Sequence, residues 1–235
     1  MTLFTRLCAA LVPLMALSGC LLSPGKFTSS LDIRKDGAFT FAYVGEVLVA
    51  DPSNRMPDMS DAETGKDGKE AASAKPIDKA KDVAAKMREI ADALSKEKGF
   101  RSVKYLDENK LSVDYQISGR LDHSFLFPFN IDAKAIIPFV AVEVRTDGKV
   151  RMQAPAFGSD NESSPGAAMG GMGAMGGGES DTKERNGTFI LTTDAEVISQ
   201  NQEDGVASGS KGKQIVWKIT PATHTAPMAV LKLMP

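Results

Sequence analysis

The two histidines and a few scattered carboxylates are the residues of this chain that suit general acid–base chemistry. His123 and His224 are the only histidines among 235 residues. Such chemistry needs a base, an orienting carboxylate and a nucleophile within hydrogen-bond reach. Asp122 adjoins His123, but neighbours on a strand point to opposite faces, so we expect both histidines to be plain surface or edge residues. Asp114, Asp122 and Asp194 are further candidate acids that the sequence does not bring together.

Met169, Met172 and Met175 recur at a spacing of three residues within a stretch rich in Gly and Ala. Soft thioethers select Cu(I), so this pattern suits a methionine-rich copper site. Against copper, no His or Cys lies nearby, and low-complexity Met/Gly sequence also arises without function. We therefore expect no metal and no cofactor. Titration with Cu(I), before and after all three methionines are changed to Ala, separates the two interpretations.

One apolar cluster in the middle of the chain suits either core packing or contact with a lipid or a partner. Its members are aromatic and branched residues on both sides of a short polar segment: Phe125, Phe127, Phe129, Ile136, Ile137 and Phe139. Most aromatic side chains are used in cores, so we expect core or edge packing. A contact surface would have to be exposed and contiguous.

Cys20 follows a segment with the layout of a secretory signal. Arg6 precedes the apolar run Leu7–Leu17, which is too short to cross a bilayer as a helix. Leu17-Ser18-Gly19-Cys20 resembles the lipobox of bacterial lipoproteins. The resemblance implies that residues 1–19 are removed and that the thiol of Cys20 carries a diacylglycerol. Ordinary signal cleavage after Ala16-Leu17-Ser18 is the alternative.

Lipidation of Cys20 would make the membrane the first partner of the mature chain. The other cysteine, Cys8, lies in the segment that is removed, so no intrachain disulfide is expected. Leu21 follows the lipobox where Asp would direct inner-membrane retention. By resemblance to enterobacterial sorting, this favours the outer membrane over the inner one. A net charge of −2 without a long basic run argues against a nucleic-acid partner.

Alternating apolar residues predict strands along most of the mature chain. One face of an early strand carries Phe39, Phe41, Tyr43, Val47 and Val49, and a later strand carries Leu111, Val113, Tyr115 and Ile117. Gly45, in phase with the first set, indicates a bulge or a close backbone approach. Thr188–Ile198, Lys213–Thr220 and Met228–Leu233 complete the pattern.

One segment has helical periodicity instead. Its apolar stripe recurs at three- and four-residue steps and consists of Ala80, Val83, Ala84, Met87, Ile90, Ala91 and Leu94. Asp78 is the expected N-cap, and Gly99 is the expected left-handed terminating residue. Residues 51–76 and 157–186 are low in large apolar residues or rich in glycine, so we expect two flexible insertions.

These elements predict an α+β domain. We expect a tether at residues 20–26 and a single domain at 27–235, with a mostly antiparallel sheet of about nine strands and one long amphipathic helix packed on one face. The segments Gly187–Ala195 and Gly212–Ile219, with an early hairpin over Leu31–Tyr43 close behind the lipobox, resemble the LppM-type bacterial lipoproteins. The resemblance implies an envelope domain with lipid-binding or surface-interaction roles and no established reaction.

We therefore expect a non-catalytic binding or scaffolding module of the cell envelope, with a lipid or an envelope protein as its ligand. An acyl chain held between helix and sheet is the form of this hypothesis that the amphipathic helix favours. Two alternatives remain. One is an envelope enzyme whose site is scattered along the chain, and the other is a structural protein of a membrane complex.

The lipobox generates the first testable prediction. A Cys20→Ser precursor should remain unprocessed and should lose its lipid label, because stable anchoring needs acyl chains on this residue. Intact-mass analysis of the membrane fraction measures both effects. Normal processing of the variant would contradict the assignment.

Overall fold

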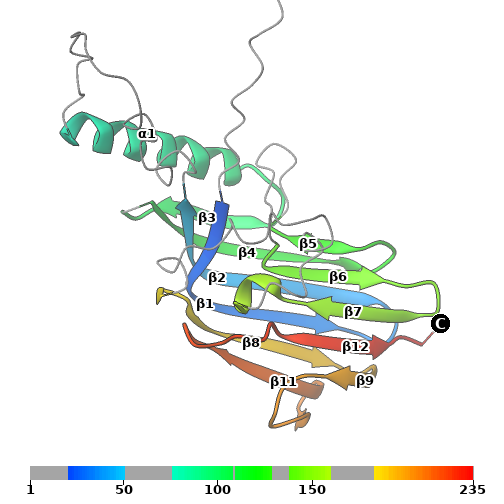
Figure 1. The fold of residues 1–235 in the computed structure, drawn as a ribbon. Coiled ribbons are helices and arrows are strands. Elements are labelled where there is room, and N and C mark those ends of the chain that lie inside the picture. The colour runs from blue at the N-terminus through cyan, green and yellow to red at the C-terminus, as the bar shows by residue number, and fades with distance from the viewer. Residues whose placement is uncertain (1–20, 51–75, 108, 129–137, 160–182, 235) are drawn as a thin grey trace, which may run out of the picture.

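The computed structural model describes residues 21–50, 76–107, 109–128, 138–159 and 183–234, which form two β-sheets and a long α-helix (Figure 1). The larger sheet has seven strands in the order β10–β11–β8–β1–β2–β4–β3. Their bounds are β1 Leu21–Ile33, β2 Ala38–Ala50, β3 Phe100–Tyr105, β4 Lys110–Arg120, β8 Asn186–Thr193, β10 Ala207–Gly209 and β11 Gly212–Ile219.

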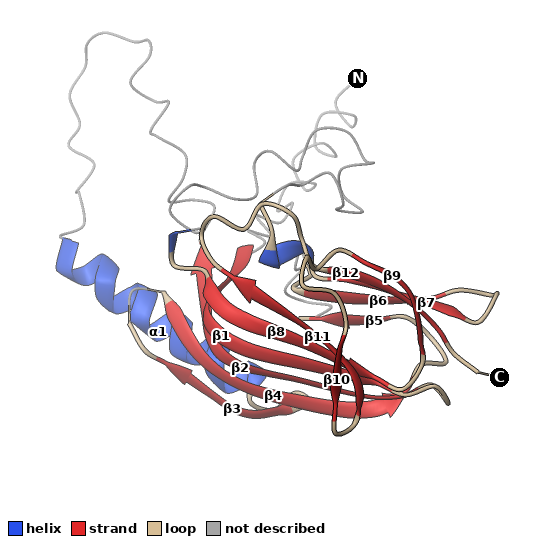
Figure 2. Cartoon of the chain, turned by 90° about the horizontal axis from the view of Figure 1, so that it is seen from below, coloured by secondary structure: helices blue, strands red, loops and turns tan. Residues whose placement is uncertain are grey.

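The smaller sheet has five strands in the order β5–β6–β7–β12–β9. Their bounds are β5 Phe125–Phe127, β6 Val140–Val144, β7 Lys149–Gln153, β9 Glu196–Gln200 and β12 Met228–Lys232. A short 3₁₀ helix, Pro155–Phe157, follows β7, and the α-helix, α1, spans Pro76–Leu94. Figure 2 shows the two sheets as separate layers, with α1 to one side of the smaller sheet.

A long hairpin formed by β1 and β2 is the centre of the larger sheet. The two strands pair antiparallel from Leu21 opposite Ala50 to Ile33 opposite Phe39. Gly37 in the connecting turn has φ +84°, a conformation that favours glycine. On its other side β1 pairs parallel with β8, which arrives much later in the chain.

Gly45 marks the close backbone approach that its position in an alternating strand predicted. The β1–β2 register shifts between Pro24 and Phe27, opposite Gly45. A Cβ at Gly45 would lie 2.4 Å from the carbonyl oxygen of Lys26 and 2.5 Å from the Cβ of Phe27. Only a residue without a side chain allows the bulged strand to lie this close.

The inward faces of the two sheets share one aromatic core. Phe127 from the smaller sheet lies 4.9 Å from Phe41 and 4.5 Å from Tyr115, measured between ring centroids, and both partners belong to the larger sheet. Phe157 of the 3₁₀ helix stacks on Phe27 at 4.4 Å. Each of these rings is buried, which confirms the faces that the period-two pattern assigned to β2 and β4.

The helix contributes to the same core from beside the edge strand β3. Met87 and Ala91 are 3% and 5% exposed, and Val83, Ile90 and Leu94 pack against the buried cluster. The helix begins at Pro76, a residue that suits the first helical turn, so Asp78 lies inside the helix and is not its cap. Gly99 has the predicted positive φ, +99°.

The class of mostly β structure with one helix is confirmed, but the arrangement differs from the single helix-covered sheet predicted above. The described residues contain twelve strands in two sheets, and the second sheet covers much of the inner face of the first. Alternation shows that one face is buried without showing what covers it. The described residues therefore form a sandwich with a helix beside it.

Three predicted boundaries need correction. Residues 21–26, expected to be a tether, are the start of β1. The predicted strand Thr188–Ile198 is divided into β8 and β9, which lie in different sheets. Both ends of the second predicted insertion, 157–186, are ordered, because Phe157 and Arg185 are buried. The first insertion, residues 51–76, lies outside the described residues except for Pro76.

Gly45→Ala should destabilise the fold by about 1–3 kcal/mol, since the new methyl group must displace backbone on β1. Urea unfolding followed by the fluorescence of Trp217 measures the change. Gly209→Ala is the matched control, because the nearest atom to its Cβ would be 3.4 Å away. Equal stability of the two variants would contradict this account of the bulge.

Candidate functional site

A polar pocket lies on the outer face of the larger sheet, beneath the turn that joins β10 to β11. Its volume is about 470 Å³, and it is lined by Ser30, Leu31, Asp32, Thr40, Ile190, Thr192, Gly209, Ser210, Lys211 and Gln214. Because successive side chains on a strand alternate between faces, burial of Leu31, Phe41 and Leu191 directs their polar neighbours outward. The pocket floor is therefore set by the same alternation that builds the core.

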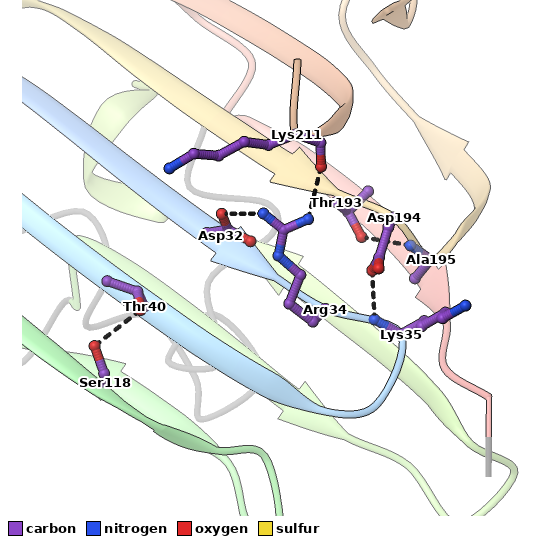
Figure 3. A network of polar contacts seen from close by, with 9 residues as sticks. All are labelled: Asp32, Arg34, Lys35, Thr40, Ser118, Thr193, Asp194, Ala195 and Lys211. Atoms are coloured by element: carbon purple, nitrogen blue, oxygen red, sulfur yellow. Dashed lines mark hydrogen bonds and ion pairs between the residues drawn. The ribbon is translucent and has the colours of Figure 1, made fainter. Parts of the chain in front are cut away.

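Arg34 connects strand β1, on one side of the pocket, with the β10–β11 turn on the other side. Its Nη2 donates to Oδ2 of Asp32 at 2.7 Å, and its Nη1 donates to the backbone carbonyl of Lys211 at 2.6 Å (Figure 3). The Arg34 and Asp32 side chains are 29% and 26% exposed, so this ion pair is only partly screened by solvent. The guanidinium holds the β10–β11 turn in place over the outer face.

The ion pair with Arg34 uses only one of the two carboxylate oxygens of Asp32. Its Oδ1 is buried and accepts no hydrogen bond from the part of the chain that the structure describes. A buried acceptor without a donor costs roughly 1–3 kcal/mol. Asp32 is one of the residues that line the pocket, so this buried acceptor belongs to the pocket wall.

Two further contacts fix the ends of the strands around the pocket. The backbone N–H of Lys35, in the β1–β2 turn, donates to Oδ1 of Asp194 at 2.7 Å. At the corner between β8 and β9, the N–H of Ala195 donates to Oγ1 of Thr193 at 3.0 Å. Figure 3 shows these contacts beside the Arg34 ion pair. The first contact ties the β1–β2 turn to a segment 159 positions later in the chain, and the second stabilises the corner locally.

The candidate acid–base residues are not gathered in one site. Asp114 pairs with Arg101 at 2.8 Å, and Asp194 caps the β1–β2 turn. Asp122 does contact Nδ1 of His123, contrary to the prediction, because the two residues lie in a bend and not on a strand. Both side chains of this pair are at least three-quarters exposed, as expected for surface residues.

His224 contacts a residue that the sequence did not connect with it. Its Nδ1 lies 3.0 Å from Oγ of Ser159, and its backbone carbonyl accepts from the N–H of Ser159 at 2.8 Å. Gly158 permits this approach, because a Cβ there would lie 2.6 Å from the carbonyl oxygen of His224. The His224 side chain is exposed and Ser159 is half-buried, so the pair lies at a loop junction near the surface.

Arg185 is the charged residue whose burial the sequence did not indicate. It is 3% exposed, and its guanidinium donates to the carbonyls of Gly158 and Thr223, each at 2.9 Å. Burial lowers the pKa of this guanidinium. The residue holds together the two segments that carry Ser159 and His224, which is a structural role.

Several candidate residues lie outside the described residues: Cys20, Phe129, Ile136, Ile137, Met169, Met172 and Met175. Phe127 and Phe139 belong to the core and Phe125 packs against it, as expected for that cluster. Within the described ranges, no group of three metal-ligating side chains occurs and no helix is long and apolar enough to span a membrane.

Comparisons with known proteins add a weak structural similarity. No known protein family matches the chain, and no curated protein matches it. Among solved structures, the chain is similar to the folded domain of the LppM protein from Mycobacterium tuberculosis. The identity is 14% over 92% of this chain and 93% of that chain, with a TM-score of 0.32. A TM-score this low does not equate the two folds.

Arg34→Gln should loosen the β10–β11 turn, because it removes the ion pair with Asp32 and the bond to the Lys211 carbonyl. A loss of about 1 kcal/mol predicts roughly fivefold faster amide exchange in residues 207–214. Hydrogen exchange measured by NMR tests this. Arg101→Gln, which breaks the exposed pair with Asp114, is the control and should leave that segment unchanged.

Proposed function

We propose that the chain is a lipid-anchored envelope lipoprotein whose folded domain is a non-catalytic binding module, with the outer-face pocket as its ligand site. The main support is the Asp32 carboxylate: Arg34 holds it, and one of its oxygens is buried and accepts no hydrogen bond from the described residues. The signal layout before Cys20 supports the anchor. A Cys8→Ser precursor, altered only in the removed segment, should mature normally and is the control for Cys20→Ser.

The chemistry of the pocket favours a ligand rich in hydroxyl or amide groups. Arg34 already balances the charge of Asp32, so the carboxylate acts as a hydrogen-bond acceptor more than as a net negative charge. Thr192 adds a hydroxyl that both donates and accepts, and Gln214 adds an amide with both functions. The hydroxyl of Thr40 lies 2.8 Å from Oγ of Ser118 and shares its hydrogen-bonding capacity with it. An isolated cation would meet no uncompensated negative charge here.

An acyl ligand between helix and sheet, which the amphipathic helix favoured, has less support. Met87 and Ala91 would have to leave the core to admit it, and both are almost fully buried. A catalytic role has less support as well, because Asp114, Asp122 and Asp194 engage different partners. Placement in the outer membrane stays a prediction from the residue after Cys20.

A tetramer of N-acetylglucosamine is a suitable probe, since it is neutral and rich in hydroxyl and amide groups. Added to residues 20–235 with Cys20→Ser, expressed without the signal segment, it should shift the amide resonances of Thr40, Thr192 and the β10–β11 turn. Thr192→Arg should fill the pocket and weaken binding by about tenfold or more, which corresponds to about 1.4 kcal/mol.

Thr188→Arg is the matched control for this titration. Thr188 lies on the same face of the same strand as Thr192 but outside the lining of the pocket. It should bind the probe like the unaltered chain. Absence of shifts, or shifts that Thr192→Arg leaves unchanged, would contradict the proposed site.

A further inference from the structure

The attachment point of the lipid is covalently adjacent to the first residue of a long, fully paired strand. Cys20 lies outside the described residues, but it is bonded to Leu21, which begins β1 and pairs with Ala50 at the end of β2. Consecutive Cα atoms are about 3.8 Å apart, so no spacer separates an anchor at Cys20 from the sheet. An anchor at Cys20 would therefore fix both where the domain lies and which of its ends faces the membrane.

The strand ends that meet at this point belong to one end of the larger sheet. The N–H of Val49 donates to the carbonyl of Asn109 at 2.9 Å, and Leu48 lies opposite Lys110. The β3–β4 turn is thus beside the start of β1. In this turn Leu106 is 47% exposed, so a large apolar side chain lies on the surface beside the start of β1.

Basic groups accompany this apolar residue. Lys104, two positions before Leu106, is exposed, and the guanidinium of Arg88 lies 5.4 Å from the ring centroid of Tyr105. Asp107 is exposed in the same turn, so the charge is mixed. A bilayer surface accommodates such a combination, because an apolar side chain enters the headgroup region while basic groups pair with lipid phosphates.

The pocket lies at the opposite end. From Leu21 to Asp32 the strand advances about 35 Å, at roughly 3.3 Å per residue. In Figure 1 the start of β1 is at the end near α1, and the β1–β2 turn is at the far end, near the C-terminus. The N–H of Met234 donates to the carbonyl of Lys35 at 2.9 Å, which confirms that placement.

We infer that the lipid on Cys20 pins the β1-start end of the sandwich against the bilayer, with the exposed Leu106 of the β3–β4 turn entering the lipid headgroup region and the Asp32 pocket facing away from the membrane. This orientation rests on the proposed lipidation of Cys20. It places the ligand site up to about 35 Å from the anchoring membrane, where a ligand that is not part of that membrane can reach it.

Fluorescence quenching in vesicles tests the orientation. The chain contains two cysteines, Cys8 and Cys20, so an introduced cysteine is the only free thiol of the mature lipidated protein. Leu106→Cys, Ile198→Cys and Lys211→Cys are each labelled with an environment-sensitive fluorophore. The proteins are then reconstituted into phosphatidylcholine–phosphatidylglycerol vesicles that carry a nitroxide near the headgroup. Ile198 is the matched control, since it is also 47% exposed but lies on β9.

The label at position 106 should lose most of its emission, while the labels at positions 198 and 211 should keep theirs. Equal quenching at all three positions, or none at 106, would overturn the orientation if intact-mass analysis shows lipid on Cys20, and would leave the anchor itself intact. A bare Cys20 in the same mass spectrum would overturn both the orientation and the proposed anchor.

Discussion

Burial of the inward face of the β1–β2 hairpin is the constraint on which the rest of the structure depends. The hairpin is long, and its aromatic side chains cannot be covered by a single helix. Phe127 of the smaller sheet contacts Phe41, Tyr43 and Tyr115 of the larger one, with ring centroids between 4.5 and 5.4 Å apart. Each buried aromatic ring contributes a large apolar area, so these contacts hold the two sheets together.

The outer-face pocket follows from the same hairpin. Once alternate residues of β1, β2 and β8 are committed to the core, their neighbours form an outer surface of short polar side chains. The β10–β11 turn covers one end of that surface because Arg34 binds both Asp32 and the Lys211 carbonyl. The site is thus built from strands that the core already holds rigid, which keeps the ordering cost of a bound ligand low.

Much of the local structure could be predicted from the sequence, because it depends on neighbours in the chain. The inward faces of β2 and β4, the glycine turn at Gly37 and the close approach at Gly45 all follow from alternation and from backbone geometry. The helix was found from its periodicity. Burial on one face, however, has the same pattern whether a helix or a second sheet supplies the cover.

The site could not be predicted for a related reason. Arg34 and Lys211 are separated by 177 positions, and only the parallel pairing of β1 with β8 brings the β10–β11 turn to Arg34. The division between β8 and β9 was missed because Thr193 and Ala195 continue the apolar alternation through the corner. Asp32 and Arg34 come just before a turn, where charged residues are common, and no local signal distinguishes a carboxylate that lines a pocket.

Native-state hydrogen exchange tests most directly whether one aromatic core supports both sheets. If it does, the slowest amides of the β1–β2 hairpin and those of β7 and β12 should open with the same free energy and the same denaturant dependence. A lower opening free energy for β7 and β12, with the hairpin still protected, would contradict the account, because the smaller sheet would then be an independent layer.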